Sequence, residues 1–305
     1  MPATTKLTVI IPAYNDADGL RKVLDALLPE ARAHNWRVTV VNDFSTDHTA
    51  QMLQAYTGQV TVITNHRNLG YGASIKRGIL QAKTEWIATM DADGQHRLED
   101  LLAMYGMLDE DVDALLGSRT RDSHAPWARR PGKWVLHHAA NFLANHPIPD
   151  INCGLRIMRR GIMLDLFNIT SDRFSFSTST TIALLQLGCR VRFVPVVVEQ
   201  RVGKSTVRML RDGLYTVMLI LRLVFLFHPL RVILPVGLGL MALAFAIFCL
   251  SLFTDISAPM TILLLFLSGL QIFLIALVAD QNSSLRRDTL LQKIRMDQLE
   301  DKGQE

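Results

Sequence analysis

The sequence predicts an α/β domain with a mostly parallel sheet, followed by an amphipathic segment and two membrane-spanning helices. Two observations support this fold class. Within the first 90 residues, short apolar runs rich in β-branched residues alternate four times with segments whose apolar residues recur at helical spacing. Further along, two long stretches carry no charged residue. The first pattern is typical of a parallel sheet covered by helices on both faces.

The predicted strands are four short apolar runs at residues 7–11, 37–41, 60–64 and 85–90. Pro12 closes the first run, and Asp16 precedes leucines at helical spacing. Because Asp favours the position just before a helix, we expect a helix to begin there. Two further helices are expected between the remaining strands.

The most informative stretch is the end of the fourth predicted strand, where an apolar run leads into Asp91, Ala92, Asp93 and Gly94. Side chains alternate along an extended chain, so the two carboxylates are expected on one side of the backbone. Such a pair suits Mg²⁺ or Mn²⁺, which leave other positions to water and a substrate diphosphate. A solvated acidic turn would show the same pattern, so the interpretation depends on the rest of the chain.

Polar side chains also follow the first and second predicted strands. Ligands of parallel sheets bind beyond the carboxyl ends of the strands, so these side chains are expected to line one nucleotide cleft. They are Tyr14, Asn15, Asp16 and Asp43, together with Asp91 and Asp93. No Gly-x-Gly-x-x-Gly follows the first strand and no Walker A motif occurs, which argues against a dinucleotide dehydrogenase or a P-loop enzyme.

Residues 232–254 and 256–279 carry no charge, and each is long enough for the ~20 apolar residues that cross a bilayer. Only Asp255 separates them, which predicts a helical hairpin. Lys and Arg lie on both outer flanks and not in the turn, which predicts that both termini and the catalytic domain are cytoplasmic. We therefore expect a multi-pass protein of the cytoplasmic membrane. A pair of buried core helices is the alternative.

The composition argues against several other classes. The three cysteines show no CxxC spacing, and one lies in a predicted span, so neither a disulfide framework nor a zinc site is expected. The net charge is +4, and the basic residues gather near the membrane segments. This favours anionic headgroups or a phosphorylated ligand over nucleic acid. Residues 7–11 are too short for a signal peptide, so the N-terminal part is expected to stay in the cytosol.

Residues 207–229 carry apolar side chains at helical spacing among basic ones, as expected for a helix on the bilayer surface. A helix packed on the sheet would show the same pattern. The expected organisation is a globular domain at residues 1–206, a juxtamembrane segment at 207–229, two membrane helices within 230–280 (about 230–254 and 256–279) and a cytosolic tail at 281–305.

Six short motifs follow one another along the chain, at residues 9–16, 41–43, 68–72, 90–96, 117–119 and 152–156. Their order and spacing resemble family 2 glycosyltransferases. Within that family they are similar to dolichol-phosphate mannose synthases and bacterial polyprenyl-phosphate glycosyltransferases. The resemblance covers about residues 5–208, and the hairpin is similar to the membrane anchor of the bacterial members.

This resemblance implies a GT-A fold, which is Rossmann-like with a mostly parallel sheet, a nucleoside-diphosphate sugar as donor and a polyprenyl phosphate as acceptor. Residues implied to hold the donor base and ribose are Pro12, Tyr14, Asp16, Val41 and Asp43. Those implied to hold Mg²⁺ or Mn²⁺ and the diphosphate are Asp91, Ala92, Asp93 and Gln95.

The resemblance also implies the positions of the cations. Arg119 would approach the phosphates, and a loop with Arg201, Gly203, Lys204 and Ser205 would close over the site. Arg129, Arg130 and Lys133 would meet the acceptor phosphate, although a solvated basic face would have the same composition. Asp91, Asp93, Arg119 and Arg201 are thus the implied catalytic residues.

The chemistry of these side chains suits displacement of a nucleoside diphosphate from an anomeric carbon. A metal and cations would stabilise charge on the leaving diphosphate. A lipid phosphate, whose second pKa is near 6, is largely ionised at neutral pH and needs no strong base. A sugar hydroxyl would need a positioned carboxylate. Direct in-line attack would invert the anomeric centre.

The chain departs from the family pattern at several positions. Asp16 stands where Glu is common, Arg201 lies two residues before Gly203 instead of three, and Thr206 replaces a lysine. Lys204 or Arg208 is a candidate for the missing cation. Residues 174–178 lack an acid that many relatives carry, so the sugar is left open.

Other functions fit the same motifs. A membrane-anchored glycosyltransferase with a saccharide or diacylglycerol-type acceptor is one alternative. A non-catalytic membrane scaffold subunit and a nucleotidyltransferase are others. A monomer and a homo-oligomer both fit the two spans, since Gly237, Gly239 and Ala242 permit close helix contact without requiring it.

Overall fold

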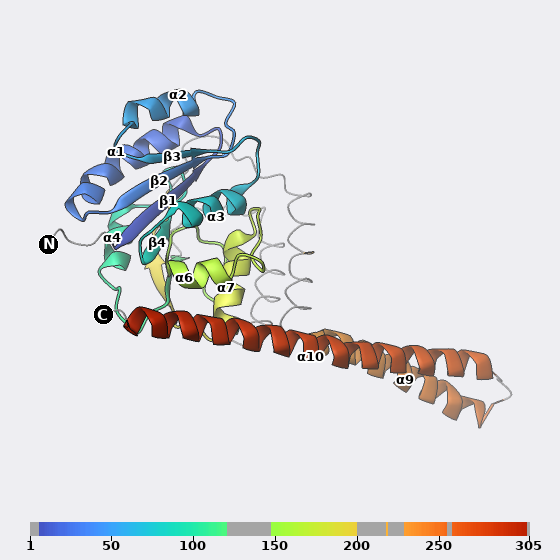
Figure 1. The fold of residues 1–305 in the computed structure, drawn as a ribbon. Helices are drawn as coiled ribbons and strands as arrows, with labels where there is room; N and C mark the ends of the chain where they lie inside the picture. The colour runs from blue at the N-terminus through green and yellow to red at the C-terminus, as the bar shows by residue number, and fades with distance from the viewer. Residues whose placement is uncertain (1–5, 121–147, 200–217, 219–228, 255–257, 304–305) are drawn as a thin grey trace. The chain divides into compact units, whose positions relative to one another are not determined.

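The computed structural model describes residues 6–120, 148–199, 218, 229–254 and 258–303 (Figure 1). The chain divides into two compact units, residues 1–219 with 294–305, and residues 220–293. The first unit contains the predicted α/β domain, and the second contains the predicted hairpin.

The first unit is built on a sheet whose described strands are arranged in the order β3-β2-β1-β4-β6-β5-β7. Four of them pair in parallel: β1 (Leu7–Ala13), β2 (Arg37–Asn42), β3 (Thr61–Thr64) and β4 (Trp86–Thr89). These are the four strands that the sequence predicts. The mostly parallel α/β fold is therefore confirmed.

The other half of the sheet is mixed. β5 (Ala114–Arg119) and β7 (Val191–Val196) are parallel to each other, whereas β6 (Arg156–Arg159) is antiparallel to both β4 and β5. The sequence pattern alone does not predict this antiparallel strand. Its position matters because β6 links the two halves of the sheet next to β4.

Helices lie on both sides of the sheet, as Figure 1 shows. They are α1 (Ala17–Ala33), α2 (Thr49–Leu53), α3 (Tyr71–Gln81), α4 (Leu98–Tyr105), α6 (Arg160–Asp165) and α7 (Phe176–Gln186). Val9 and Ile11 belong to the core cluster that includes Leu24 of α1 and Leu101 of α4. Ile10 faces the opposite way and touches α3 at Gly78, where a Cβ would clash with it. β1 is therefore buried on both faces, as expected for a central parallel strand.

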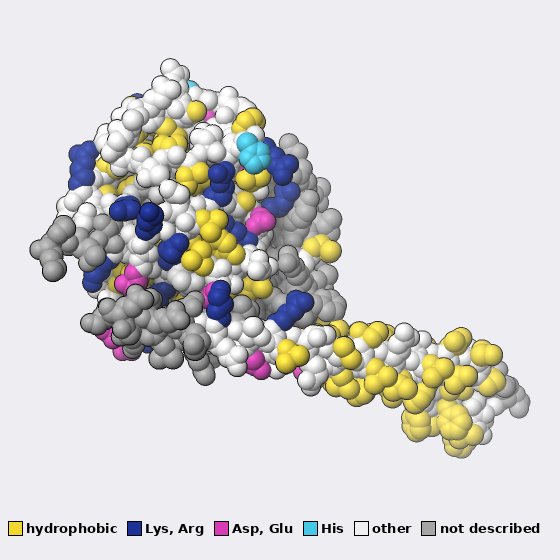
Figure 2. Space-filling view, in the orientation of Figure 1, with side chains coloured by type: hydrophobic (Ala, Val, Ile, Leu, Met, Phe, Trp, Pro, Cys, Tyr) yellow, Lys and Arg dark blue, Asp and Glu magenta, His cyan; other side chains and the backbone are white. Residues whose placement is uncertain are grey.

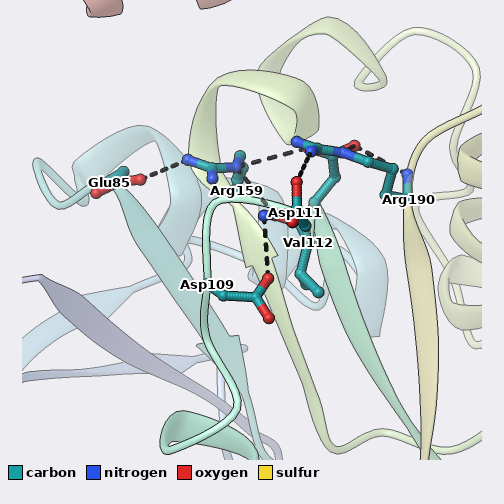
Figure 3. A network of polar contacts seen from close by, with 7 residues as sticks. Glu85, Asp109, Asp111, Val112, Arg159 and Arg190 are labelled. Atoms are coloured by element: carbon teal, nitrogen blue, oxygen red, sulfur yellow. Dashed lines mark hydrogen bonds and ion pairs between the residues drawn. The ribbon is translucent and has the colours of Figure 1, made fainter.

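Ion pairs link neighbouring segments at one edge of the sheet (Figure 3). At this edge β4, β5 and β7 begin and β6 ends. Arg159 pairs with Glu85 at 2.5 Å, and Arg190 pairs with Asp111 at 3.3 Å. Asp113 is the most buried acid of this group, with a side chain only 6% exposed. Its carboxylate accepts hydrogen bonds from the Arg190 backbone N–H at 2.8 Å and from Arg190 Nη2 at 3.0 Å. These contacts hold the start of β7 against the start of β5.

The second unit contains α9 (Pro229–Ser251) and the part of α10 (Pro259–Gly303) up to residue 293. Both are long and apolar enough to cross a membrane. Hydrophobic side chains dominate their surface in Figure 2, whereas charged side chains are spread over the first unit. Length and composition thus suggest membrane anchoring. The tail predicted at residues 281–305 continues α10 as a helix as far as Gly303.

The two helices approach closely at a pair of glycines. A Cβ on Gly237 would lie 2.9 Å from the Gly269 carbonyl oxygen, and a Cβ on Gly269 would lie 2.8 Å from the Gly237 oxygen. Gly239, in contrast, has no atom within 4 Å of the corresponding position. Of the two glycines that the sequence analysis singled out, Gly237 is therefore used inside the hairpin.

We predict that Asp113→Ala lowers the free energy of unfolding by about 1–3 kcal/mol, because the donors of Arg190 lose their buried acceptor. Thermal unfolding of the detergent-purified chain, followed by tryptophan fluorescence, measures the change. Asp111→Ala is the matched control, since the Asp111 side chain is 93% exposed and pairs with the same arginine. Equal melting temperatures for the two variants would contradict the prediction.

Candidate functional site

The loops that follow β1, β2 and β4 lie together at the carboxyl edge of the sheet. Asn15 has a left-handed backbone with φ of 51°, and its side-chain oxygen accepts the Thr46 N–H at 2.7 Å. This bond joins the first loop to the second. At Gly19 of α1 a Cβ would lie 2.7 Å from the Ala92 carbonyl oxygen, so only glycine lets α1 approach the third loop this closely. The loops that the sequence predicts at one edge are therefore neighbours.

Asp91 is held by side chains from two elements. The Tyr71 hydroxyl, at the start of α3, donates to Asp91 Oδ1 at 2.8 Å, and His96 Nε2 lies 3.2 Å from Oδ2. Burial raises the pKa of Tyr71 well above its ordinary value, and the charge and hydrogen bond of Asp91 raise it further. Tyr71 is thus a hydrogen-bond donor at neutral pH. The sequence pattern alone indicates no such role for Tyr71.

Gly154 lies directly against the same carboxylate. A Cβ at this position would be 2.7 Å from Asp91 Cγ and closer still to one carboxylate oxygen. Thr89 Oγ1 donates to the Gly154 carbonyl at 2.7 Å, which fixes this backbone next to β4. The Asp91 carboxylate therefore packs against the Gly154 backbone and also contacts the side chains of Tyr71 and His96.

Asp93 is 8% exposed, and its Oδ1 accepts the Gln95 N–H at 3.2 Å. Gly94 between them has φ of 69°, which glycine adopts without strain. The Gln95 side-chain nitrogen donates to the Glu199 carbonyl at 2.8 Å, and the Glu199 N–H donates back to the Gln95 carbonyl at 2.9 Å. The turn that carries both carboxylates is thus attached to residue 199, a contact that the sequence did not indicate.

The oxygen atoms of this turn fit a metal ion whose remaining ligands come from a substrate and water. No group of three or more His, Cys, Asp or Glu side chains placed to hold a metal occurs in the described part of the chain. Mg²⁺ does not require one, because it commonly takes one or two carboxylates together with phosphate oxygens and water. Asp91 and Asp93 are the carboxylates that such a metal would take here, and the side-chain oxygen of Gln95 would be a further ligand; these roles stay predictions.

Asp43, which is predicted to bind the nucleotide sugar, also has a structural role. It is 4% exposed, and its carboxylate accepts the N–H groups of Leu69 and Gly70, both at 2.8 Å. The Asn65 side chain adds a third bond at 2.6 Å. Asp43 therefore fixes the loop that leads directly into Tyr71. Its contact with a donor stays a prediction.

The other residues expected to hold the donor occupy two environments. Pro12 and Val41 are buried partners in the β1–β2 ladder. Ala92 is buried as well, at 6% exposed, whereas Tyr14 is 37% exposed at the end of β1. Asp16 is the residue before α1, but its side chain makes no capping hydrogen bond. These positions border the site without testing the predicted contacts.

Arg119 lies at the end of β5 and forms a bidentate ion pair with Asp150. Arg119 Nε and Nη2 donate to the two Asp150 oxygens at 2.5 and 2.8 Å. Burial alone would raise the pKa of Asp150, but the hydrogen bonds and charge of Arg119 outweigh burial and hold that pKa below its ordinary value. Asp150 was not among the residues predicted for the site. The role of Arg119 at the phosphates stays a prediction.

Arg156 of β6 is a second arginine of the site, and only 1% of it is exposed. Its guanidinium donates to the Cys153 and Ile151 carbonyls at 2.7 and 3.1 Å and to Thr181 Oγ1 at 2.9 Å. It thereby fixes the backbone around Gly154, which contacts Asp91. Nothing in the sequence distinguished it from the other residues of its motif.

The remaining predicted site residues lie outside the described part of the chain. They are Arg129, Arg130 and Lys133, expected at the acceptor phosphate, and Arg201, Gly203, Lys204, Ser205, Thr206 and Arg208 of the expected closing loop. Their roles stay predictions.

Two family models match the chain. The model described as Glycosyl transferase family 2 matches residues 8–167, and the model described as GtrB C-terminal hairpin matches residues 228–285. The first match covers β1 to α6, and the second covers α9 and α10 as far as residue 285.

Curated relatives carry related names. An uncharacterized glycosyltransferase of Mycobacterium tuberculosis is 30% identical over 199 residues, which are 65% of this chain and 87% of the relative. The undecaprenyl-phosphate 4-deoxy-4-formamido-L-arabinose transferase of Proteus mirabilis is 27% identical over 164 residues, which are 52% of this chain and 50% of the relative. This chain therefore matches about half of the second relative's length.

Among solved structures, the chain is similar to glucosyl-3-phosphoglycerate synthase from Mycobacterium tuberculosis, crystallised with Mn²⁺, UDP and glucosyl-3-phosphoglycerate. The TM-score is 0.58 at 16% identity, and the match covers 73% of this chain and 80% of the other. At this identity the similarity establishes the fold alone.

We predict that Gly154→Ala weakens Mn²⁺ binding at least about tenfold, because the new Cβ displaces the Asp91 carboxylate. Gly161→Ala in α6 is the matched control, since a Cβ there meets no atom within 4 Å. Electron paramagnetic resonance of free Mn²⁺ measures both affinities on the purified chain. Unchanged affinity in a correctly folded Gly154→Ala protein would show that Asp91 holds no metal.

Proposed function

The chain belongs to glycosyl transferase family 2 and is a glycosyltransferase, and from this we propose that it transfers a sugar from a nucleoside-diphosphate sugar to a polyprenyl phosphate. One observation carries the proposal. A single chain joins the Asp91–Asp93 turn at the carboxyl edge of a GT-A sheet to a hairpin of two apolar helices. The turn suits a diphosphate donor, and the hairpin suits an acceptor that resides in a membrane.

In this proposal the metal is Mg²⁺ or Mn²⁺, held by Asp91, Asp93 and Gln95. Bound there, it would neutralise charge on the departing nucleoside diphosphate. Tyr71 and His96 orient the Asp91 carboxylate through the contacts described above. Because both side chains already contact Asp91, the turn needs little rearrangement before it binds the nucleotide sugar.

The base and ribose of the donor would contact the loops after β1 and β2. Tyr14 is exposed there, and Asp43 holds the neighbouring loop in place. We assign donor binding to Pro12, Tyr14, Asp16, Val41, Asp43 and Ala92, and to Lys204 and Ser205 beyond residue 199. Arg119 and Arg201 would add positive charge near the diphosphate. The two hydrogen bonds from Arg119 to Asp150 limit the movement of the Arg119 side chain.

A polyprenyl phosphate is the acceptor that these side chains suit best. Its phosphate is largely ionised at neutral pH, so it can attack without a strong general base. Arg129, Arg130 and Lys133 would receive this phosphate. The relative named as an undecaprenyl-phosphate transferase and the matched hairpin model support the same acceptor class. In-line attack would invert the anomeric centre.

The proposed site of action is the cytoplasmic face of the cell membrane. Lys and Arg flank the hairpin on both outer sides, so the catalytic unit and both termini would be cytoplasmic. The proposed organisation remains a catalytic domain at residues 1–206, a juxtamembrane segment at 207–229, the hairpin at 230–280 and a cytosolic extension at 281–305.

We expect nucleoside-diphosphate release that requires a lipid phosphate. The detergent-purified chain is assayed over a panel of nucleotide sugars with Mg²⁺ or Mn²⁺, with and without undecaprenyl phosphate. Asp93→Asn should lower the rate about 100-fold or more, since charge on the leaving group loses its stabilisation. Asp111→Asn, at the opposite edge of the sheet, should retain activity.

The outcomes separate the parts of this proposal. Equal release with a diacylglycerol or saccharide acceptor would overturn the acceptor class and leave the glycosyltransferase activity intact. Full activity of Asp93→Asn, or activity in the presence of a strong chelator, would overturn the role of the metal. An NMR spectrum showing retained anomeric configuration would overturn direct in-line attack.

A further inference from the structure

Over residues 264–285, α10 has two faces with different surroundings. On one face Gly269, Ala276 and Ser283 are buried, and Gly269 contacts α9. On the opposite face seven exposed residues follow one another at alternating spacings of four and three. We name this set the outer stripe: Leu264, Ser268, Gln271, Ile275, Val278, Asn282 and Leu285. Such spacing is the pattern by which one helix packs along another.

Gln271 makes the outer stripe unusual. The apolar run of α10 extends over residues 259–279, so Gln271 lies two residues from its middle, or about 3 Å along the axis. Headgroups begin about 15 Å from the bilayer centre, which is beyond the reach of a glutamine side chain. Its amide is exposed and forms no hydrogen bond with any described residue. Hydrocarbon would leave that amide unsatisfied, which is costly.

The other exposed positions at this depth raise no such difficulty. Leu267, Leu274 and Leu277 are 49%, 53% and 40% exposed and suit lipid tails. A depression of about 500 Å³ on the hairpin is likewise lined by apolar side chains, such as Met241, which lipid can cover. The polar side chains Ser268 and Gln271 therefore mark the outer stripe as the face that needs a partner other than lipid.

We propose that the outer stripe of α10 packs against the outer stripe of a second copy of this chain. An amide carries both a donor and an acceptor, so two Gln271 side chains related by a twofold axis satisfy each other. Ser268, one turn away, adds a hydroxyl on the same face and is small enough for close approach. The stripe spans 22 residues, or about 32 Å of helix, and its first five members, from Leu264 to Val278, lie within the apolar run at residues 259–279.

This inference rests on the proposed membrane insertion of the hairpin. A second copy is the partner with matched chemistry, because the same polar groups occur at the same depth in both chains. The pairing is isologous and closed, so it gives a dimer and leaves each sheet domain with its own site.

Disulfide cross-linking in vesicles tests the orientation. The full chain is reconstituted in phosphatidylethanolamine–phosphatidylglycerol vesicles, with Cys189 and Cys249 replaced by serine. Ile275→Cys, in the outer stripe, should form a disulfide-linked dimer with a membrane-permeant oxidant. Leu277→Cys is exposed at nearly the same depth on another face and should cross-link little. Equal cross-linking of the two variants would overturn the proposal.

Energy transfer between labelled copies, measured as lipid is added, tests the role of the amide. Gln271→Leu should raise the dissociation constant about 3- to 30-fold, the range expected for one interhelical polar pair. Leucine favours membrane insertion, so the loss would not arise from a failure to insert. Leu274→Ala, outside the stripe, should leave the constant unchanged. Wild-type association of Gln271→Leu would overturn the proposal.

Flotation with the vesicles separates this inference from the membrane proposal. A chain that fails to float would overturn membrane insertion, and the dimer with it. A chain that floats but shows no energy transfer at any lipid dilution would overturn the dimer alone.

Discussion

The site depends on the close approach of backbone to the turn that carries Asp91 and Asp93. Gly19 of α1 meets this turn at Ala92, and Gly154 meets the Asp91 carboxylate itself. Gly94 allows the turn to reverse with a positive φ. A side chain at Gly19 or Gly154 would push the carboxylates out of place. The absence of a Cβ at these positions therefore determines where both carboxylates lie.

Hydrogen bonds then connect this turn to the rest of the sheet edge. Asp43, at the end of β2, accepts the N–H groups of Leu69 and Gly70 just before Tyr71. Tyr71 in turn donates to Asp91 at the end of β4. Asp43, which the sequence predicts to bind the donor, thus also positions the tyrosine that orients Asp91. The ends of β2 and β4 are coupled although β1 lies between them in the sheet.

The parts of the structure that could be predicted from sequence are those encoded locally. β-branched runs and helical periodicity located the strands at Leu7–Ala13 and Arg37–Asn42, and uncharged length located the hairpin. The antiparallel β6 was missed, since a four-residue run does not reveal which strands it joins. Asp150 was missed for a related reason, because its arginine lies 31 residues away in the chain. Long-range pairings decide the contacts around the site, and single-sequence patterns do not contain them.

The two units also meet their polar requirements in different ways. In the sheet domain a buried charge such as Arg156 is satisfied by carbonyl and hydroxyl oxygens brought together by the fold. In a bilayer the backbone groups of each helix hydrogen-bond to one another, so the polar groups still in need of a partner are those of side chains. Gln271 is the amide of the described hairpin that does so, and it lies on the face turned away from α9. The same physical rule that brings Tyr71 to Asp91 within one chain would bring Gln271 to its counterpart in another.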